Sequence, residues 1–319
     1  MRFYFAVFFC LLGIPIATAQ NLLMNGSFED SVYCGSWIPD VAEITQPYTG
    51  ISAIAGSVDY YSAACGLIPW NTAGYVIPQD GNAVVGFFAF SANGPTLEIP
   101  QVKLIQPLLA DSLYRVSFYI YLADISQYAV NQIRVAMMVD SIYLWDEINN
   151  FHLGNSKVCW ESNPDEFVDN RYWRQYAFDY VATGMEKFMT VSSLQIPANI
   201  IYKMVKPDAT AYQAYYYIDN LQVVKVNKNL LFPNVFTPNG DGINDAWEPT
   251  IQGYPEFLLQ VFNRWGKCVF QTRYLNEPWN GGIFNNLSLP CTEGVYYYLF
   301  QATHPAARAL QSGTIHLFR

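Results

Sequence analysis

The sequence predicts an all-β protein built from two β-sandwiches, and three observations lead to that prediction. Aromatic residues make up 17% of the chain, with 24 Tyr, 21 Phe and 8 Trp, and such residues favour strands. Short apolar runs alternate with turn residues along most of the length. An apolar repeat of about 3.6 residues, typical of a helix, is not sustained anywhere. A length of 319 residues suits two domains.

The N-terminus has the pattern of a secretory signal peptide. Arg2 is followed by an apolar run over Phe3–Ile16, and Ala17-Thr-Ala19 is a small-residue cleavage site. The alternative is a transmembrane anchor, but the run is shorter than the ~20 residues that span a bilayer. We therefore expect residues 1–19 to be a signal peptide and the mature chain to start at Gln20.

Residues 20–226 form the first expected domain, a sandwich of many short strands. Strands are expected at Gln101–Leu109, Leu113–Leu122, Ile133–Val139, Tyr176–Val181 and Tyr215–Val226. The second of these alternates most clearly, with Val116, Phe118 and Ile120 on one face. Turn residues between the runs favour a sandwich over a helical fold.

Residues 227–319 form a second, smaller domain with the strand content of an Ig-like sandwich. Its turns are rich in Pro, Gly and Asn, and its strands are expected at Phe257–Phe262, Val269–Gln271, Val295–Ala302 and Thr314–Phe318. The change in composition near residues 227–230 predicts a domain boundary there.

Charge and motif content argue against two classes of function. The chain has 17 basic and 26 acidic residues, a formal charge of −9, which does not suit a nucleic-acid binder. The sequence has no catalytic signature such as GxSxG, HExxH or GxxxxGK[ST]. The acidic pairs Asp146-Glu147 and Asp165-Glu166 offer glycosidase carboxylates, although such clusters are more often solvated surface. We therefore expect no enzyme.

Export would leave five cysteines in an oxidising compartment, where they are disulfide candidates. We predict the pairs Cys34–Cys65 and Cys268–Cys291, because the members of each pair lie near each other in one domain. Cys159 then remains, and the alternatives for it are a buried free thiol or a disulfide between chains.

The C-terminal domain carries five motifs in order, at Phe232–Asp245, Val261–Phe270, Trp279–Gly281, Gly294–Tyr298 and Gly313–Arg319. This order resembles the gliding-motility-associated C-terminal domain of Bacteroidetes, a type B sorting signal of the type IX secretion system. The positions that carry the resemblance include Asn239, Asp241, Asn244, Asp245, Arg264, Trp265, Gly266, Trp279, Gly294 and Arg319.

That resemblance implies the type IX secretion machinery as a partner, and a place in the medium or on the outer surface of a Gram-negative Bacteroidetes-type cell. It implies no catalysis by this domain. From the residues themselves, we expect Trp265 and Trp279 to anchor a small core, and Gly240 and Gly242 to form a tight turn. The segment 239–245 also offers oxygen ligands like half a calcium loop, an alternative to a plain Asx turn.

The first domain opens with Asn21–Glu29 and closes with Tyr217–Val223. This pairing resembles the galactose-binding-like jelly rolls, which include many carbohydrate-binding modules. The resemblance implies a jelly roll whose first and last strands lie together, and a structural calcium ion at Glu29 and Asp219. The alternative is that Glu29 caps a turn and Asp219 accepts backbone N–H bonds.

A binding role follows from this resemblance and from aromatic residues outside the clear strands. Sugar rings stack on exposed Trp and Tyr side chains, which also supply polar groups. The candidates are Trp37, Tyr48, Trp70, Trp145, Trp160 and Tyr172, with burial in the core as the alternative for each. We expect a non-catalytic protein that binds glycan or polymer at the cell surface. The alternative function is a structural or adhesion protein of the cell surface or gliding machinery that contacts protein partners.

Overall fold

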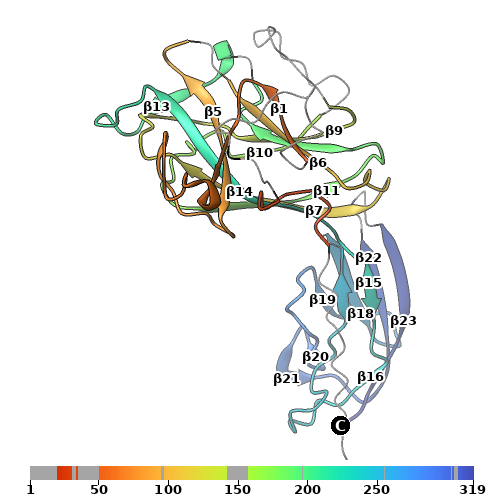
Figure 1. Cartoon of the computed structure of the whole chain (residues 1–319). Coiled ribbons are helices and arrows are strands. Elements are labelled where there is room, and N and C mark those ends of the chain that lie inside the picture. The colour runs from red at the N-terminus through yellow and green to blue at the C-terminus, as the bar shows by residue number, and fades with distance from the viewer. Residues whose placement is uncertain are drawn as a thin grey trace, which may run out of the picture.

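The computed structural model of this chain describes residues 20–30, 34, 50–94, 97–141, 157–195, 197–254, 256–302, 304 and 308–319. In these ranges the chain forms strands and two short 3-10 helices, at Ala63–Cys65 and Pro197–Asn199. Figure 1 shows two sandwiches connected in sequence, and the predicted all-β fold is confirmed. The expected signal peptide, residues 1–19, lies outside the described residues.

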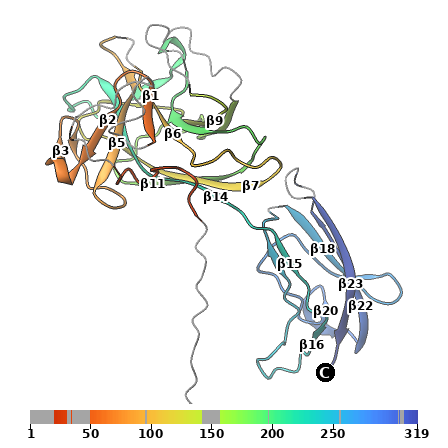
Figure 2. The same ribbon diagram turned by 45° about the vertical axis from the view of Figure 1, so that its right-hand side comes forward.

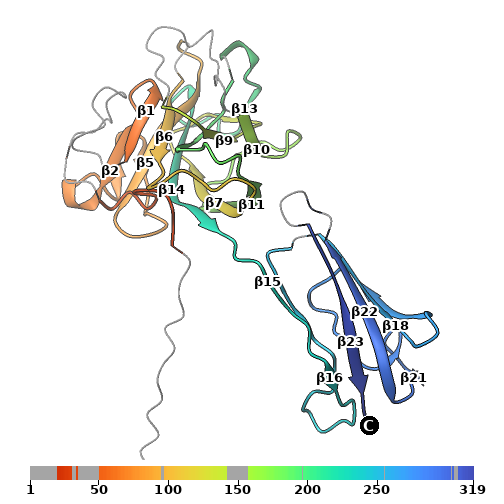
Figure 3. The same ribbon diagram turned by 90° about the vertical axis from the view of Figure 1, so that its right-hand side faces the viewer.

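The first domain is a jelly-roll sandwich of two five-stranded sheets, whose layers can be followed in Figure 3. One sheet has the order β1 (Ile51–Ala55), β6 (Ile99–Lys103), β12 (Phe188–Ser192), β9 (Arg134–Met138) and β10 (Lys157–Glu161). The other has the order β11 (Arg174–Val181), β7 (Leu113–Leu122), β14 (Gln213–Lys225), β5 (Ala83–Ser91) and β2 (Asp59–Ser62). Two-stranded sheets pair β3 (Trp70–Asn71) with β4 (Gly74–Tyr75), and β8 (Tyr128–Val130) with β13 (Tyr202–Met204). The last strand, β14, therefore lies in the middle of its sheet.

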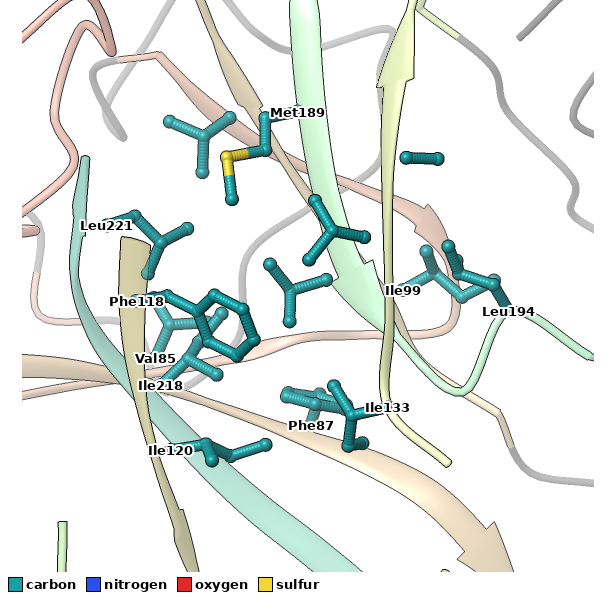
Figure 4. Close-up of a cluster of buried hydrophobic side chains, with 14 of the residues drawn as sticks. Val85, Phe87, Ile99, Phe118, Ile120, Ile133, Met189, Leu194, Ile218 and Leu221 are labelled. Atoms are coloured by element: carbon teal, nitrogen blue, oxygen red, sulfur yellow. The ribbon is translucent and has the colours of Figure 1, made fainter. Parts of the chain in front are cut away.

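The main core lies between the two five-stranded sheets. Strand β7 buries Val116, Phe118 and Ile120 completely, as its alternating sequence predicts. Figure 4 shows Phe118 beside Ile218 of β14, with Met189 of β12 on the opposite sheet. Burial of such side chains contributes roughly 1.5–3 kcal/mol each, which makes this layer the main source of stability for the domain.

The outer face of the β14 sheet carries a second buried cluster. Tyr216 points into the main core, while its neighbours Tyr215 and Tyr217 point the other way and are fully buried as well. Ala73 and Val76, on the loop that contains β3 and β4, pack over these tyrosines. The first half of β14 is therefore buried on both faces, which explains the unbroken apolar and aromatic run Ala214–Ile218.

The two ends of the first domain are bonded to each other. Asn21 forms an antiparallel bridge with Val224, its Nδ2 donates to the Leu221 carbonyl at 2.8 Å, and its Oδ1 accepts the Val223 N–H at 2.9 Å. This side chain thus replaces the ladder bonds of a longer first strand. The first and last segments lie together, as the jelly-roll resemblance implied.

The second domain has one five-stranded sheet and a smaller opposing layer. The sheet order is β16 (Val235–Phe236), β23 (Ala309–Leu317), β22 (Gly294–Ala302), β18 (Phe257–Phe262) and β19 (Cys268–Thr272). The opposing layer contains β15 (Asn229–Leu231) paired with β17 (Thr250–Gln252), and β20 (Gly282–Ile283) paired with β21 (Asn286–Pro290).

Two tryptophans anchor the small core of the second domain, and only one of them was predicted. Trp247 and Trp279 form an antiparallel bridge and are completely buried. Trp279 is thus a core anchor, as expected. Trp265 is not, because it sits on the turn between β18 and β19, where side chains project beyond the sheet, and it is 76% exposed.

One of the two predicted disulfides is confirmed and the other is wrong. Cys34 and Cys65 are bonded. Cys268 and Cys291 are free thiols because they face different surroundings: the Cys268 Sγ donates to the Phe270 carbonyl at 3.2 Å, whereas Cys291 is buried in the small core. Cys159 is a half-buried free thiol, and burial raises its pKa to about 12.

Candidate ligand-binding surface

The loop that covers the second cluster contains a small hairpin with an exposed tryptophan. Strands β3 and β4 pair Trp70 with Tyr75 and Asn71 with Gly74, and Figure 2 shows β3 at the edge of the domain beside β2. The Asn71 Oδ1 accepts the Ala73 N–H at 2.8 Å and so closes the turn. Gly74 has a φ of +111°, which side-chain-bearing residues rarely adopt.

Trp70 is the most exposed aromatic side chain on this hairpin, at 68%. Its ring meets the Tyr75 ring edge-to-face, with centroids 5.0 Å apart. This contact orients the indole without burying its outer face. The hairpin therefore presents an oriented apolar ring to solvent.

Further aromatic side chains lie next to the end of the hairpin loop. The Trp173 Nε1 donates to the Ile77 carbonyl at 2.7 Å, and the Trp173 ring packs against Tyr121 at 5.6 Å. Tyr172 is 67% exposed and Ile77 is 59% exposed. Together with the hairpin, the residues in contact with it or with one another form what we call the Trp70 surface: Trp70, Tyr75, Ile77, Tyr121 and Trp173.

Polar groups border the Trp70 surface where the hairpin meets the segment after β7. A Cβ on Gly74 would lie 3.4 Å from the Asp124 Cβ, so these backbones are close. The Tyr121 hydroxyl donates to the Asp124 Oδ1 at 3.2 Å, and burial, aided by the Asp124 charge, raises the pKa of Tyr121 to about 12. The Arg171 guanidinium donates to the Ala123 and Ser126 carbonyls at 2.9 Å each. A carboxylate and a guanidinium thus flank the aromatic rings.

Buried hydroxyl groups attach the hairpin to the sheet beneath it. The Tyr217 hydroxyl donates to the Asn71 Oδ1 at 2.7 Å, and the Tyr61 hydroxyl lies 2.8 Å from the Thr72 Oγ1. Behind them, the Tyr215 hydroxyl donates to the Asp59 Oδ2 at 2.6 Å. Burial raises the pKa of both Asp59 and Tyr215. The hairpin is therefore fixed by side chains from β2 and β14.

The aromatic residues that the sequence analysis proposed as ligand contacts differ in their burial. Trp70 and Tyr172 are both exposed, and Trp70 lies on the hairpin. Trp160 lies on β10 and packs against Phe118, Tyr176 and Phe178, so its ring belongs to the core. Trp37, Tyr48 and Trp145 lie outside the described residues. Tyr75 was missed, although the Asn-Thr-Ala-Gly turn between it and Trp70 is a hairpin signal.

Glu29 and Asp219 meet at one loop, residues 79–83. The Glu29 Oε1 accepts the N–H groups of Asn82 and Ala83 at 2.8 and 2.9 Å. The Asp219 Oδ2 accepts the N–H groups of Gln79 and Asp80 at 2.8 and 3.0 Å.

The fit of this loop to a calcium ion is partial. The Asp219 Oδ1 accepts the Asn220 N–H at 2.6 Å, so both oxygens of this carboxylate face N–H groups. Burial raises the pKa of Asp219 to about 7. Within the described ranges, no group of three or more His, Cys, Asp or Glu side chains is arranged to hold a metal. The contacts match turn capping, and a cation would need further oxygens from backbone carbonyls.

The motif loop of the second domain, residues 239–245, is closed by its own side chains. The Asp245 Oδ1 and Oδ2 accept the N–H groups of Gly240 and Gly242, each at 2.7 Å, and these bonds lower the pKa of Asp245. The Asn239 Oδ1 accepts the Asp241 N–H at 3.0 Å. These contacts are those of an Asx-type turn, with Asn244 in a left-handed conformation.

The C-terminal Arg319 is bonded to the residues that precede β20 and follow β21 in the second domain. Its Nη2 donates to the carbonyls of Gly281 and Cys291, at 3.2 and 3.3 Å. The last motif therefore contributes to the fold of the domain.

Comparison with protein families identifies the second domain. Residues 230–317 match the CHU_C Type IX secretion signal domain. The chain is therefore exported to the cell surface or the medium of a Bacteroidetes-type bacterium, with the type IX secretion machinery involved, as the resemblance implied. In the described part of the chain, no helix has the length and apolarity needed to cross a bilayer.

Comparison with solved structures finds sandwich domains that cover much of the chain. A CBM4 domain is 12% identical and covers 63% of this chain and 97% of its own, with a TM-score of 0.33. The CBM22-1 xylan-binding domain of Xyn10C from Paenibacillus barcinonensis is 15% identical, covering 66% and 97%, with a TM-score of 0.34. The K1 cleaved adhesin domain of Lys-gingipain from Porphyromonas gingivalis W83 is 16% identical, covering 62% and 94%, with a TM-score of 0.31. At these values the likenesses carry no functional argument. No curated protein matches the sequence.

Proposed function

Because residues 230–317 are a type IX secretion signal, we propose that residues 20–226 act outside the cell as a non-catalytic module that binds glycan or a related polymer. The binding site is the Trp70 surface. The observation that carries this proposal is the exposed Trp70 ring, which Tyr75 orients and which the fold does not bury.

A fixed aromatic ring suits a sugar ligand for two physical reasons. The C–H face of a sugar ring packs on an indole, while its hydroxyls need polar partners at the edge, where the Asp124 carboxylate and the Arg171 guanidinium lie. Because buried tyrosines hold the hairpin in place, little conformational freedom is lost on binding.

A glycan-array screen of the full mature chain tests the proposal. We expect Trp70→Ala to reduce binding to the selected glycan by about tenfold or more, as truncation of a central aromatic contact does. The matched control is Tyr274→Ala, which removes an aromatic side chain of 70% exposure from the second domain. Equal binding by wild type and Trp70→Ala would contradict the site.

The absence of catalysis is part of the proposal. Asp165 and Glu166 are exposed, and Glu166 lies 3.5 Å from Arg174, as expected of solvated surface charges. Asp146 and Glu147 lie outside the described residues. We expect no release of reducing ends when the chain is incubated with the polysaccharides it binds. Measurable hydrolysis that is lost in Glu166→Gln would contradict this part of the proposal.

A second candidate function is adhesion to a protein partner, and one feature favours it. Strand β13 exposes Tyr202 and Met204, and Ile201 before it is 59% exposed. Exposed apolar side chains of this kind occur at protein interfaces. If cell-surface binding persists in Trp70→Ala but falls in Ile201→Ser, adhesion through β13 replaces glycan binding as the function.

A further inference from the structure

Only some of the residues in the turn between β18 and β19 make the contacts that form it. The Asn263 N–H donates to the Lys267 carbonyl at 3.0 Å, and the Gly266 N–H donates to the Asn263 carbonyl at 2.9 Å. The Asn263 Oδ1 accepts the N–H groups of Trp265 and Lys267 at 3.1 and 3.0 Å. Gly266 has a φ of +75°, a left-handed conformation that favours glycine. Asn263 and Gly266 therefore account for the turn.

The two residues between them, Arg264 and Trp265, make no comparable contribution to the fold. Trp265 is 76% exposed, and the Arg264 guanidinium lies over its ring, 4.9 Å from the centroid. Among the described residues, no carboxylate lies within ion-pair distance of Arg264. By contrast, Trp279 is fully buried and its Nε1 donates to the Gly282 carbonyl. One motif tryptophan serves the core, and the other faces solvent beside a cation with no paired carboxylate.

A hollow of about 180 Å³ adjoins this turn. Val269, Cys291 and Tyr296 line it with apolar surface, and Arg264, Trp265 and Gly294 also border it. Gly294 has a φ of +139°, and a Cβ there would lie 3.8 Å from the Arg264 Nη2. Glu293 also borders the hollow, but its Oε1 accepts the Arg319 N–H at 2.7 Å. The turn thus combines an exposed ring, a positive charge and an adjacent apolar hollow.

We infer that the Arg264–Trp265 turn and its hollow form the surface by which the sorting domain docks on the type IX secretion machinery, through a partner segment that carries a carboxylate beside an apolar side chain. The chemistry of this partner segment follows from two observations. The domain is a type IX secretion signal, so the machinery must contact its surface. The Arg264 charge complements a carboxylate, while Trp265 and the hollow complement an apolar group.

Export of the full chain from a type IX-competent Bacteroidetes host tests this inference. The variants are Trp265→Ala and Arg264→Glu, and the matched control is Leu310→Ala, which removes a side chain of 74% exposure from β23 of the same domain. We expect both turn variants to reduce the fraction of protein in the medium or on the cell surface by about tenfold, with accumulation in the periplasm. Leu310→Ala is expected to be exported like the wild type.

Melting temperatures of the purified variants separate docking from folding. We expect Trp265→Ala and Arg264→Glu to melt like the wild type, and Arg264→Lys, which keeps the charge, to restore much of the export. Wild-type export of both turn variants would overturn the inference. A loss of export accompanied by an equal loss in the Leu310→Ala control, or by a lowered melting temperature, would also overturn it. Glycan binding is not part of the readout, so the result is independent of the function proposed for the first domain.

Discussion

Glu98 is a buried carboxyl whose protonation links the stability of the first domain to pH. It is 3% exposed, its Oε2 accepts the Phe88 N–H at 3.0 Å, and burial, aided by the Asp59 charge, raises its pKa from 4.5 to about 8. Between these two values the folded state holds a proton that the unfolded state has released. The stabilisation from Glu98 is therefore complete below about pH 4.5 and is lost as the pH rises to about 8.

The variant Glu98→Gln tests this linkage because it resembles the protonated acid at every pH. We expect urea unfolding to show the variant to be more stable than the wild type at pH 8, by on the order of 3 kcal/mol, and similar to it at pH 4. Glu166→Gln, an exposed change, is the control and should leave the pH dependence unaltered. A wild-type curve that is flat from pH 4 to pH 8 would refute the assignment.

Glu29 and Asp219 carry the proposal that a calcium ion stabilises the first domain. Both carboxylates hold the loop 79–83, and backbone carbonyls would have to supply the other ligands of the ion. Binding to the folded state alone adds about 2.7 kcal/mol at a hundredfold excess over Kd. We therefore expect EDTA to lower the melting temperature of the wild type, and Glu29→Gln with Asp219→Asn to remove that sensitivity. Identical wild-type melting curves with calcium and with EDTA would leave turn capping as the role of both residues.

At the scale of elements, the β3–β4 hairpin depends on the sheet beneath it. Tyr217→Phe removes the hydroxyl that donates to the Asn71 Oδ1, at a cost of about 1 kcal/mol. We expect faster hydrogen exchange at the Val76 amide, which donates to the Pro69 carbonyl across the loop. Tyr114→Phe is a matched control, because its hydroxyl instead accepts the Leu109 N–H. If both variants change exchange at Val76 equally, the effect is global and the attachment is not specific.

Strands with strong alternation were predictable, and short or irregular elements were not. Leu113–Leu122 and Phe257–Phe262 match β7 and β18 residue for residue, because one face of each is apolar. The expected strand Gln101–Leu109 is shorter in the structure, where β6 spans Ile99–Lys103 and is followed by a bridge at Leu104 and a bond from the Ile105 N–H. The β3–β4 hairpin was missed because its strands have two residues each.

The fate of an individual tryptophan was the least predictable feature of the candidate sites. Trp70 and Trp160 look alike in the sequence, yet one lies on an exposed hairpin and the other packs on Phe118. Trp265 was expected in a core because indoles are usually buried, but its position on a turn decides its exposure. Such outcomes depend on tertiary contacts, which composition and spacing do not encode.

At the scale of the whole molecule, the secretion signal lies in the second domain, outside the hydrophobic core of the first domain. The two domains have separate hydrophobic cores, so removal of residues 230–319 leaves the first core complete. We expect this truncated chain to lose its signal peptide normally, to fold, and to remain in the periplasm. Cell fractionation measures its location, and a cooperative melting curve of the retained protein shows that it is folded. Wild-type amounts of the truncated chain outside the cell would contradict the sorting role of the second domain.

The central place of β14 has a consequence for the order of events during synthesis. β14 is the last strand of the first domain, yet it joins β7 on one side to β5 on the other. Until residues 213–225 have emerged, the β11–β7 pair and the β5–β2 pair have no strand between them, and Asn21 has no partner. Contacts that span 200 residues of sequence form slowly. The sheet therefore closes only when nearly the whole of the first domain has been synthesised.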